Sequence, residues 1–280
     1  MLHVIEHSVI DSIKLVPFLF LTYLAMEYLE HRTGNGIQKW LKSADKAAPV
    51  IGGLLGAVPQ CGFSAAASNL YAGRVITLGT LIAIYLSTSD EMLPVLISER
   101  APFHEIMGIL LGKALIGMTA GLLIDLIRRR KGTEPGGSIH DICEQEHCHC
   151  EKGIFLSAVT HTVQIAFFIL LVTVALNLVL HFAGEDILEK LLRDKTVLGP
   201  VLAGAVGLIP NCAGSVVITQ LYLEGALSLG AAMAGLLTGS GVGVLVLFRV
   251  NHNRKENLKI LGLLYGIGVA AGILTGFFSA

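Results

Sequence analysis

Long apolar stretches alternate with short polar ones along the chain. Several of the apolar stretches reach about 18 residues, which is enough to cross a hydrocarbon core about 30 Å thick. Backbone groups in lipid must be hydrogen-bonded within the protein, so we expect the spans to be helices. The strict alternation of a transmembrane β-barrel is absent. The apolar segments run over residues 10–30, 47–72, 75–98 and 103–127 in the first half, and over 154–182, 197–224, 226–248 and 259–279 in the second.

Composition points to the same class of protein. Of the 280 residues, 53% are hydrophobic and only 15% are charged, and the mean hydropathy is +0.70. Soluble domains carry about 25% charged residues, so this chain has too little polar surface for a soluble globule of its size. A net charge of −1 gives no reason to expect a nucleic-acid partner, whereas the lipid bilayer is the expected environment. The N-terminus lacks the pattern of a cleaved signal peptide.

The two halves of the chain carry the same motif. Residues 56–64 read GAVPQCGFS and residues 207–215 read GLIPNCAGS, an offset of 151 residues. A colinear series of such matches indicates an internal duplication. Further matches are Leu70-Tyr71 with Leu221-Tyr222 at the same offset, and Gly108 and Gly112 with Gly262 and Gly266 at an offset of 154.

Basic residues predict how the two halves are oriented. Lys and Arg cluster at 32–46 and at 128–131, and the positive-inside rule places both clusters in the cytoplasm. Four full crossings per half would put the clusters on opposite sides. One segment per half is therefore expected to be a re-entrant hairpin or to resolve into two spans. The 47–72 segment and its counterpart are the best candidates, because each is interrupted by Pro.

An odd number of crossings makes the halves inverted repeats, a plan that several secondary transporters use. The predicted fold class is an all-α polytopic membrane protein with broken or re-entrant helices, about 8–10 membrane segments in all. We expect a multi-pass protein of a cell membrane of the bacterial inner-membrane type, with both termini outside. A homo-oligomer is compatible with this plan. The expected parts are a first transmembrane repeat over 1–128, a cytoplasmic His- and Cys-rich linker over 129–153 and a second transmembrane repeat over 154–280.

The paired Pro motifs are the strongest candidates for a binding site. Pro59 and Pro210 cannot donate a backbone hydrogen bond and favour the first turn of a helix. We interpret each motif as an unwound turn that begins a half-helix, whose N-terminus presents unpaired amides. The alternative is a pair of Pro kinks with small buried cysteines, but repetition of the amide–thiol pair favours a site. The donors beside the turns are Gln60, Cys61 and Ser64 in the first half, and Asn211, Cys212 and Ser215 in the second.

A second polar cluster interrupts the 75–98 segment past its middle. A carboxylate inside a membrane costs about 2.5–3.5 kcal/mol and usually faces a polar cavity. The negative charge comes from the first half only, which suits a cationic substrate or a proton-coupling carboxylate. The alternative places the acids at a helix end near the interface. Lys113 is either their counter-ion or a lysine that extends to the membrane surface. The cluster comprises Ser87, Ser89, Asp90 and Glu91, and its counterpart comprises Thr238 and Ser240.

The linker concentrates metal-binding residue types and holds three of the five cysteines. Disulfides are rare in a reducing cytoplasm, where thiol and imidazole clusters more often bind metal. The spacing fits no single zinc motif, so we expect a loose metal-collecting or sensing loop, with a merely solvated linker as the alternative. The residues are His140, Cys143, His147, Cys148, His149 and Cys150.

With these motifs the chain resembles the ten-transmembrane heavy-metal exporter family, whose members are labelled arsenic efflux protein or manganese transporter. The resemblance covers nearly the whole chain and implies export of a metal or metalloid. A fainter similarity links it to larger permeases associated with organoarsenical efflux. The motifs that carry the resemblance are Pro59-Gln60-Cys61, Pro210-Asn211-Cys212 and the run from Ser87 to Glu91.

Ligand chemistry narrows the expected substrate. Carboxylate and amide oxygens with two sulfurs suit Mn²⁺ or Fe²⁺, whereas arsenite would prefer two or three thiolates. The predicted function is a secondary transporter that exports a divalent transition metal, manganese favoured, through a mid-membrane site between the repeats. The alternative is an arsenite or organoarsenical efflux permease. No phosphate-binding G-x-x-x-x-G-K-[ST] motif occurs, so transport would be passive or driven by a proton or ion gradient. We expect no enzymatic activity and no cofactor apart from the metal as substrate.

Overall fold

Helices make up every regular element that the structure describes. The structure is a computed structural model, and it describes residues 16–17, 20–21, 24, 47–57, 61–89, 92–130, 159–160, 162–164, 166–168, 170–171, 174, 198–210 and 212–279. The predicted all-α class is confirmed in these ranges. The helices are α3 (Ala48–Gly56), α4 (Cys61–Ala72), α5 (Leu78–Ser87), α6 (Met92–Ser98), α7 (Phe103–Arg130), α11 (Leu198–Gly207), α12 (Cys212–Leu223), α13 (Leu229–Thr238), α14 (Gly243–Val250) and α15 (Arg254–Ser279).

The same series of helices occurs twice, so α3 to α7 correspond to α11 to α15. The N-caps of the third helix in each series are equivalent as well. The Thr77 side chain accepts a hydrogen bond from Thr80 N at the start of α5, and the Ser228 side chain accepts one from Ala231 N at the start of α13. Capping by Ser or Thr fixes where these helices begin, because it satisfies an otherwise unpaired backbone amide.

Helices α3 and α4 form a hairpin. Along α3, Gly52 lies against Ile84 of α5, and Gly56 lies against Ser87 further along α5, so α3 and α5 are parallel. Helix α4 is antiparallel to α5, because its end leads directly into α5 while Ser68 meets Tyr85 near the other end of α5. The hairpin therefore has its tip beside the end of α5. This is one of the two arrangements expected for the Pro-interrupted segment.

The second half contains the same hairpin. Gly207, at the end of α11, lies against Thr238 at the end of α13. The Thr238 hydroxyl lies 2.8 Å from Gly204 O on α11 and can donate a hydrogen bond to it. Ile218 of α12 packs on Gly235 of α13, as Ser68 of α4 packs on Tyr85 of α5.

Helices α5 and α13 lie at the centre of the bundle. Residues 79–87 and residues 230–238 are all buried. Each helix is the first part of a longer apolar stretch, Leu78–Ser98 or Leu229–Val250, that is interrupted in its middle. These two stretches, together with Phe103–Arg130 and Arg254–Phe278, are the four helices in the described ranges that are long and apolar enough to cross a membrane.

Glycines let α5 and α13 pack closely on their neighbours. A methyl group on Gly121 of α7 would lie 2.5 Å from Gly79 O, and one on Gly272 of α15 would lie 2.6 Å from Gly230 O. Small residues spaced by four allow such close helix contact in membranes. The register differs from the one expected, because these equivalent contacts follow the offset of 151 and not 154. A methyl group on Gly108, Gly262 or Gly266 would meet nothing within 4 Å.

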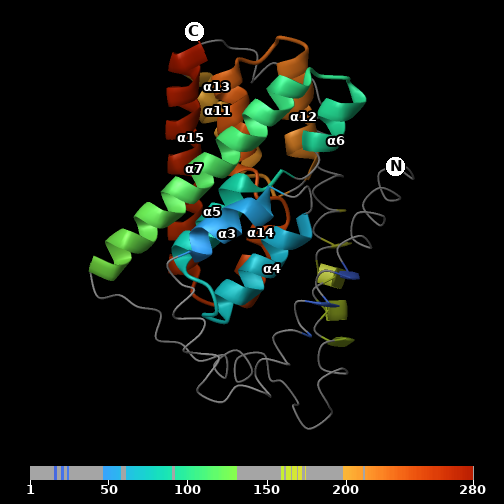
Figure 1. Cartoon of the computed structure of the whole chain (residues 1–280). Coiled ribbons are helices and arrows are strands. Elements are labelled where there is room, and N and C mark those ends of the chain that lie inside the picture. The colour runs from blue at the N-terminus through green and yellow to red at the C-terminus, as the bar shows by residue number, and fades with distance from the viewer. Residues whose placement is uncertain are drawn as a thin grey trace.

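Helices α5 and α13 begin at opposite ends of α15. Helix α5 begins beside the end of α4, where the Tyr71 hydroxyl donates to Glu256 in the first turn of α15. Helix α13 begins at the other end of α15, because Gly230 packs against Gly276. Figure 1 shows the consequence for the long helices, since α7 runs down from the end near α6 while α15 runs up to the C-terminus.

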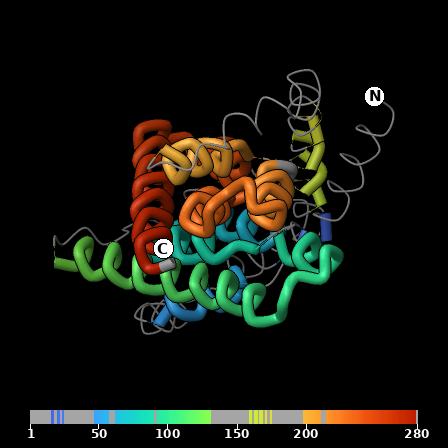
Figure 2. The backbone as a smooth tube through the Cα atoms, turned by 90° about the horizontal axis from the view of Figure 1, so that it is seen from above, coloured from blue at the N-terminus to red at the C-terminus, as the bar shows by residue number. Residues whose placement is uncertain are grey.

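The halves exchange contacts reciprocally. Helix α4 packs against α14 of the other half, and α12 packs against α6. The α6–α12 and α4–α14 pairs lie toward opposite ends of the bundle (Figure 1). Seen from above, the helices of the second half, in orange and red, lie directly beside those of the first half, in blue to green (Figure 2). Equivalent helices of the two halves therefore make equivalent contacts with the other half.

Candidate functional site

Two helix breaks form the centre of the candidate site. Helix α5 ends at Ser87 before α6 begins at Met92, and α13 ends at Thr238 before α14 begins at Gly243. The breaks are polar in an otherwise apolar interior. Four of the predicted site residues lie on them and are buried: Ser87, Ser89, Thr238 and Ser240.

The hydroxyls at the breaks donate to the backbone. Ser87 Oγ donates to Ile84 O at 3.1 Å, and Ser89 Oγ donates to Ser87 O at 3.1 Å. In the second half, Thr238 Oγ1 has carbonyl oxygens at 2.8–3.1 Å. A hydroxyl has one proton to donate and two lone pairs that accept. The oxygens therefore present acceptor lone pairs, which is the polarity that a cation requires.

Each hairpin tip touches the break of its own half. A methyl group on Gly56 would lie 2.1 Å from Ser87 Oγ, and one on Gly207 would lie 2.3 Å from Thr238 Oγ1. The helices after the tips, α4 and α12, begin at Cys61 and Cys212. The sequence motif thus starts a half-helix at the same place in both halves, next to a polar break.

Several predicted donors lie outside the described residues. They are Gln60, Asp90, Glu91 and Asn211, the side chains of Cys61 and Cys212, and the linker residues His140, Cys143, His147, Cys148, His149 and Cys150. Among the residues that are described, no three His, Cys, Asp or Glu side chains lie close enough together to hold a metal ion.

A buried polar contact joins the two halves beside the breaks. A methyl group on Gly243, the first residue of α14, would lie 2.7 Å from Ser64 Cβ, so Ser64 lies close to the break that contains Ser240. Ser68 Oγ lies 2.7 Å from Ser64 O, from Tyr85 Oη and from Gly243 O. The hydroxyl donates to one carbonyl at a time, and Tyr85 can donate to it. Ser64 and Ser68 are fully buried.

The sequence interpretation missed Ser68 and Tyr85. The repeat contained a signal for Ser68, because Thr219 follows it by 151 residues and makes the same contact. Thr219 Oγ1 donates to Ser215 O at 2.7 Å, as Ser68 can donate to Ser64 O. Ser215, unlike Ser64, is only half-buried. No feature of the sequence distinguishes Tyr85 from an ordinary core aromatic residue.

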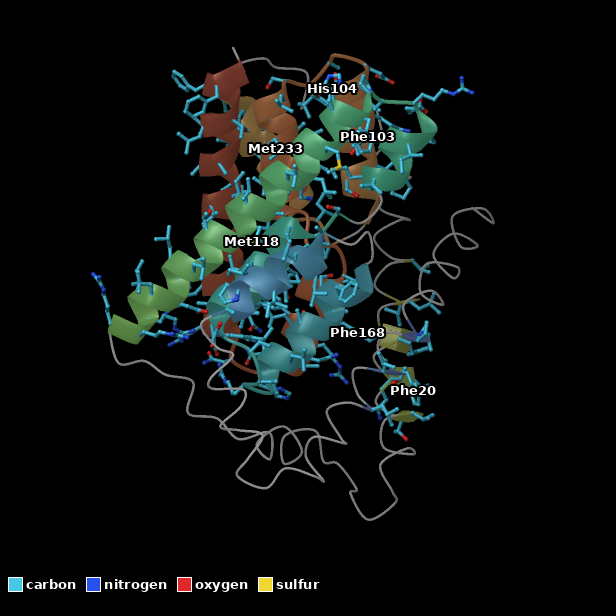
Figure 3. The ribbon with its side chains drawn as sticks, viewed as in Figure 1. Phe20, Phe103, His104, Met118, Phe168 and Met233 are labelled. Atoms are coloured by element: carbon cyan, nitrogen blue, oxygen red, sulfur yellow. The ribbon has the colours of Figure 1, made fainter. Side chains whose placement is uncertain are left out.

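Lys113 is buried at the first break. Its side chain is 1% exposed, and its ammonium group donates to Thr88 O, two residues before Asp90. A lysine that extends to the membrane surface, one of the two alternatives, does not fit this burial. The ammonium group lies at the break itself, and the counter-ion alternative stays a prediction because Asp90 and Glu91 lie outside the described residues. Figure 3 shows Met118 further along α7 than Phe103 and His104, which stand at the start of that helix.

Paired hairpins, broken helices and a long apolar periphery define a multi-pass helical membrane protein with a buried polar centre. Residues 2–185 and 154–279 both match the sequence profile of a family described as "Putative, 10TM heavy-metal exporter". The two matches together cover nearly the whole chain, so the chain belongs to this family. No curated protein and no solved structure shows significant similarity to the chain.

Proposed function

We propose that the chain is a secondary transporter that exports a divalent transition-metal ion through a site between its two halves. Manganese is the favoured ion. The family description supports heavy-metal export. One observation carries the rest, namely that each half has a hairpin tip against a buried polar helix break. Discontinuous helices of this kind form ion and substrate sites in secondary transporters, because their exposed backbone ends replace lost hydration.

Helix length supports a position near mid-membrane. Helices α5 and α13 have 10 residues each, which corresponds to about 15 Å at 1.5 Å per residue. A hydrocarbon core is about 30 Å thick. A span that begins at one surface and ends after 10 residues therefore stops about halfway across.

Charge supports a cation as the substrate. Neutral hydroxyl, amide and thiol donors alone hold a divalent ion poorly, because its lost hydration must be replaced at low dielectric. Asp90 and Glu91 follow the break at Ser89 and would supply the negative charge. Lys113 would neutralise part of this charge when no metal is bound, so the empty site need not contain unpaired acids.

The opposite run of the two halves supports inverted repeats. Arg130 at the end of α7 and Arg254 at the start of α15 lie at the same end of the bundle, where Asp125 contacts the start of α5 and Glu256 contacts Tyr71. Basic residues collected at one end suit the cytoplasmic face. We infer that this end faces the cytoplasm and that the start of α7 faces outward.

Ion flux into and out of proteoliposomes tests the proposal. Purified full-length protein would be assayed with Mn²⁺, Fe²⁺, Co²⁺, Zn²⁺ and arsenite, with and without a pH gradient. We expect saturable Mn²⁺ flux that responds to the gradient, because the charged site must be neutralised to return empty. Arsenite flux without any divalent metal flux would contradict the metal proposal.

Arsenite efflux is a second candidate function, because α4 and α12 each begin at a cysteine. Replacement of sulfur by oxygen separates the two candidates. Cys61→Ser with Cys212→Ser is expected to retain Mn²⁺ flux and to shift preference toward harder ions. The same variant would lose arsenite flux, because arsenite depends on thiolate ligands.

A further inference from the structure

A stripe of polar residues lies along one face of α4 and of α12, starting at the hairpin tip. Positions 61, 64, 68 and 71 are spaced by three and four residues, so they share one face of α4. The equivalent positions give the same stripe on α12. Its members are Cys61, Ser64, Ser68 and Tyr71 on α4, and Cys212, Ser215, Thr219 and Tyr222 on α12.

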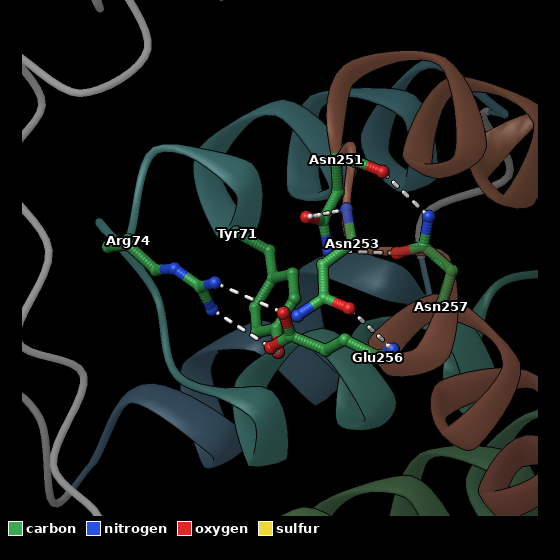
Figure 4. A network of polar contacts seen from close by, with 6 residues as sticks. All are labelled: Tyr71, Arg74, Asn251, Asn253, Glu256 and Asn257. Atoms are coloured by element: carbon green, nitrogen blue, oxygen red, sulfur yellow. Dashed lines mark hydrogen bonds and ion pairs between the residues drawn. The ribbon is translucent and has the colours of Figure 1, made fainter. Parts of the chain in front are cut away.

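The α4 stripe ends at a charged cluster that joins the two halves, which we name the Tyr71 cluster (Figure 4). It consists of Tyr71, Arg74 and Glu256. Tyr71 Oη donates to Glu256 Oε1 at 2.5 Å, and the two Arg74 Nη atoms donate to the two carboxylate oxygens at 2.9 and 3.0 Å. These hydrogen bonds raise the pKa of Arg74 still further, so its charge is constant. A bidentate pair of this kind is among the stronger polar contacts.

Asparagines hold the Glu256 side of the cluster in place. Asn251 Nδ2 donates to Asn257 Oδ1, and Asn257 Nδ2 donates to Asn251 O, both at 2.8 Å. Glu256 N donates to Asn253 Oδ1 at 3.3 Å. The start of α15 is thereby fixed relative to the end of α14, and Figure 4 shows these contacts leading to the ion pair.

The other end of the bundle carries the equivalent tyrosine and glutamate but lacks equivalents of Arg74 and Asn257. Tyr222 ends the α12 stripe, and Glu105 in the first turn of α7 is the equivalent of Glu256. Helix α12, which carries Tyr222, packs against α6, and Glu105 follows α6 in the first turn of α7. We name these two residues the Tyr222 pair. Gly225 stands in the place of Arg74, and Ile106 in the place of Asn257.

The backbone conformation of Arg74 is unfavourable for an arginine. It has φ 56°, and its equivalent Gly225 has φ 70°. The turns are alike, because Arg74 N bonds Tyr71 O and Gly225 N bonds Tyr222 O in the same way. Glycine adopts this left-handed conformation without strain, whereas arginine does not. Strain that is kept at one of two equivalent turns points to a function for the arginine.

We propose that the Tyr71 cluster closes the path to the central site at one end of the bundle and that the Tyr222 pair closes it more weakly at the other. Opening one closure while the other holds gives alternating access around a fixed site. The arginine and the asparagines make the Tyr71 end the one that stays closed without substrate. The inference rests on the proposed transport function, but its contacts do not depend on which ion is carried.

Hydrogen–deuterium exchange of the purified full-length protein tests the closure. Arg74→Gly removes the ion pair and relieves the strain, and Glu256→Gln removes the charge of its partner. Each is expected to speed exchange by about tenfold in both contacting segments, 67–77 and 250–258, as for loss of a coupled charge pair. The double variant should exchange no faster than the faster single variant, because both changes break the same contact.

Matched variants separate the ion pair from other effects. Arg100 also has a positive φ of 54° and is exposed, so Arg100→Gly relieves strain at the other end of the bundle. Arg254→Gln removes a charge beside Glu256 without touching the pair. Neither is expected to change exchange of segment 250–258. Arg74→Lys keeps the positive charge but loses the bidentate guanidinium contact, so it should show protection between that of the native protein and that of Arg74→Gly.

Labelling of Cys61 and Cys212 tests access to the site. A membrane-impermeant thiol reagent would be added to vesicles from the side of the Tyr71 cluster, and labelled peptides would be quantified by mass spectrometry. Arg74→Gly should speed labelling from this side, and Glu105→Gln should slow it by favouring the opposite opening. Unchanged labelling in Arg74→Gly, or unchanged exchange of segment 250–258, would overturn the closure. Altered exchange and labelling in a protein without Mn²⁺ flux would support the closure and refute only the metal proposal.

Discussion

Lys113 occupies a position at which the second half has a hydrophobic residue. Its equivalent, 151 residues later, is Leu264, which is 0% exposed as Lys113 is 1% exposed. A lysine in the middle of a membrane helix costs about 2.5–3.5 kcal/mol on insertion scales. The repeat shows that leucine fits such a site, so the fold does not require the charge. We therefore expect the charge to serve the proposed site at the break, where the ammonium group donates to Thr88 O.

Replacing Lys113 by leucine, the residue at the equivalent position of the second half, tests the role of this charge. Lys113→Leu is expected to lower both the KM for Mn²⁺ and the maximal flux, because no internal cation then competes with the metal for the acids or helps to release it. Saturation curves in proteoliposomes would measure both. Leu111→Ala, at an exposed position of the same helix, is the control. A higher KM at unchanged maximal flux would contradict the role.

Asp90 is the residue that we expect to supply most of the charge of the proposed site. Asp90→Asn is expected to abolish Mn²⁺ binding or its proton coupling while the unfolding midpoint in detergent stays the same or rises, since a costly buried charge is removed. Calorimetric titration of Mn²⁺ and a thermal unfolding curve would be measured together. Normal flux with normal pH dependence would place the acid outside the site.

At the scale of the elements, the hairpin tips reach the breaks only because Gly56 and Gly207 have no side chain. A methyl group on either residue would meet a hydroxyl oxygen closer than any real contact allows. Neither glycine has positive φ, since the positive-φ glycines in the described ranges are Gly225 and Gly241. Close approach, and not backbone conformation, is therefore the reason for glycine here.

A single added methyl group tests the contact between tip and break. Gly56→Ala forces the hairpin away from Ser87 and is expected to cost about 1–3 kcal/mol, as overpacking usually does. The measurement is the thermal unfolding midpoint of the purified protein, together with Mn²⁺ flux. Gly262→Ala on α15, where a methyl group meets nothing within 4 Å, should leave the midpoint unchanged or raise it. Equal effects of the two substitutions would mean that the tip does not press on the break.

At the scale of the whole molecule, the topology can be tested directly. Single cysteines at Ser138 and Ser279 would be labelled with an impermeant reagent on intact cells, and mass spectrometry would distinguish them from the native cysteines. We expect Ser279→Cys to be labelled and Ser138→Cys to be protected, because an odd number of crossings per half leaves the termini outside and the linker inside. The opposite result would exclude the predicted orientation.

The linker is expected to act apart from the transport path. Replacement of Cys143, His147, Cys148, His149 and Cys150 by Ser should leave Mn²⁺ flux measurable and weaken only the response at low metal concentration, because the linker lies outside the membrane segments in the predicted topology. Flux over a range of Mn²⁺ concentrations measures both effects. Complete loss of flux in a folded variant would place the linker in the path.

The sequence by itself determined the local and the repeated features. The lengths of the apolar runs determine helices, because lipid leaves no other pairing for the backbone. The repeated Pro and Cys motif located the starts of α4 and α12. The position of the basic residues predicts a hairpin or an extra span in each half. These features follow from one segment at a time, or from the comparison of one half with the other.

Only the tertiary structure decided which residues meet. It set the register of α7 and α15 at 151 residues, buried Lys113 against Thr88, and joined Ser68 to Gly243 across 175 residues of sequence and Tyr71 to Glu256 across 185. Such contacts depend on how closely glycine-faced helices approach one another. A hydrophobic pattern records which face of a helix is buried but not which partner buries it, because every apolar partner satisfies that face about equally well.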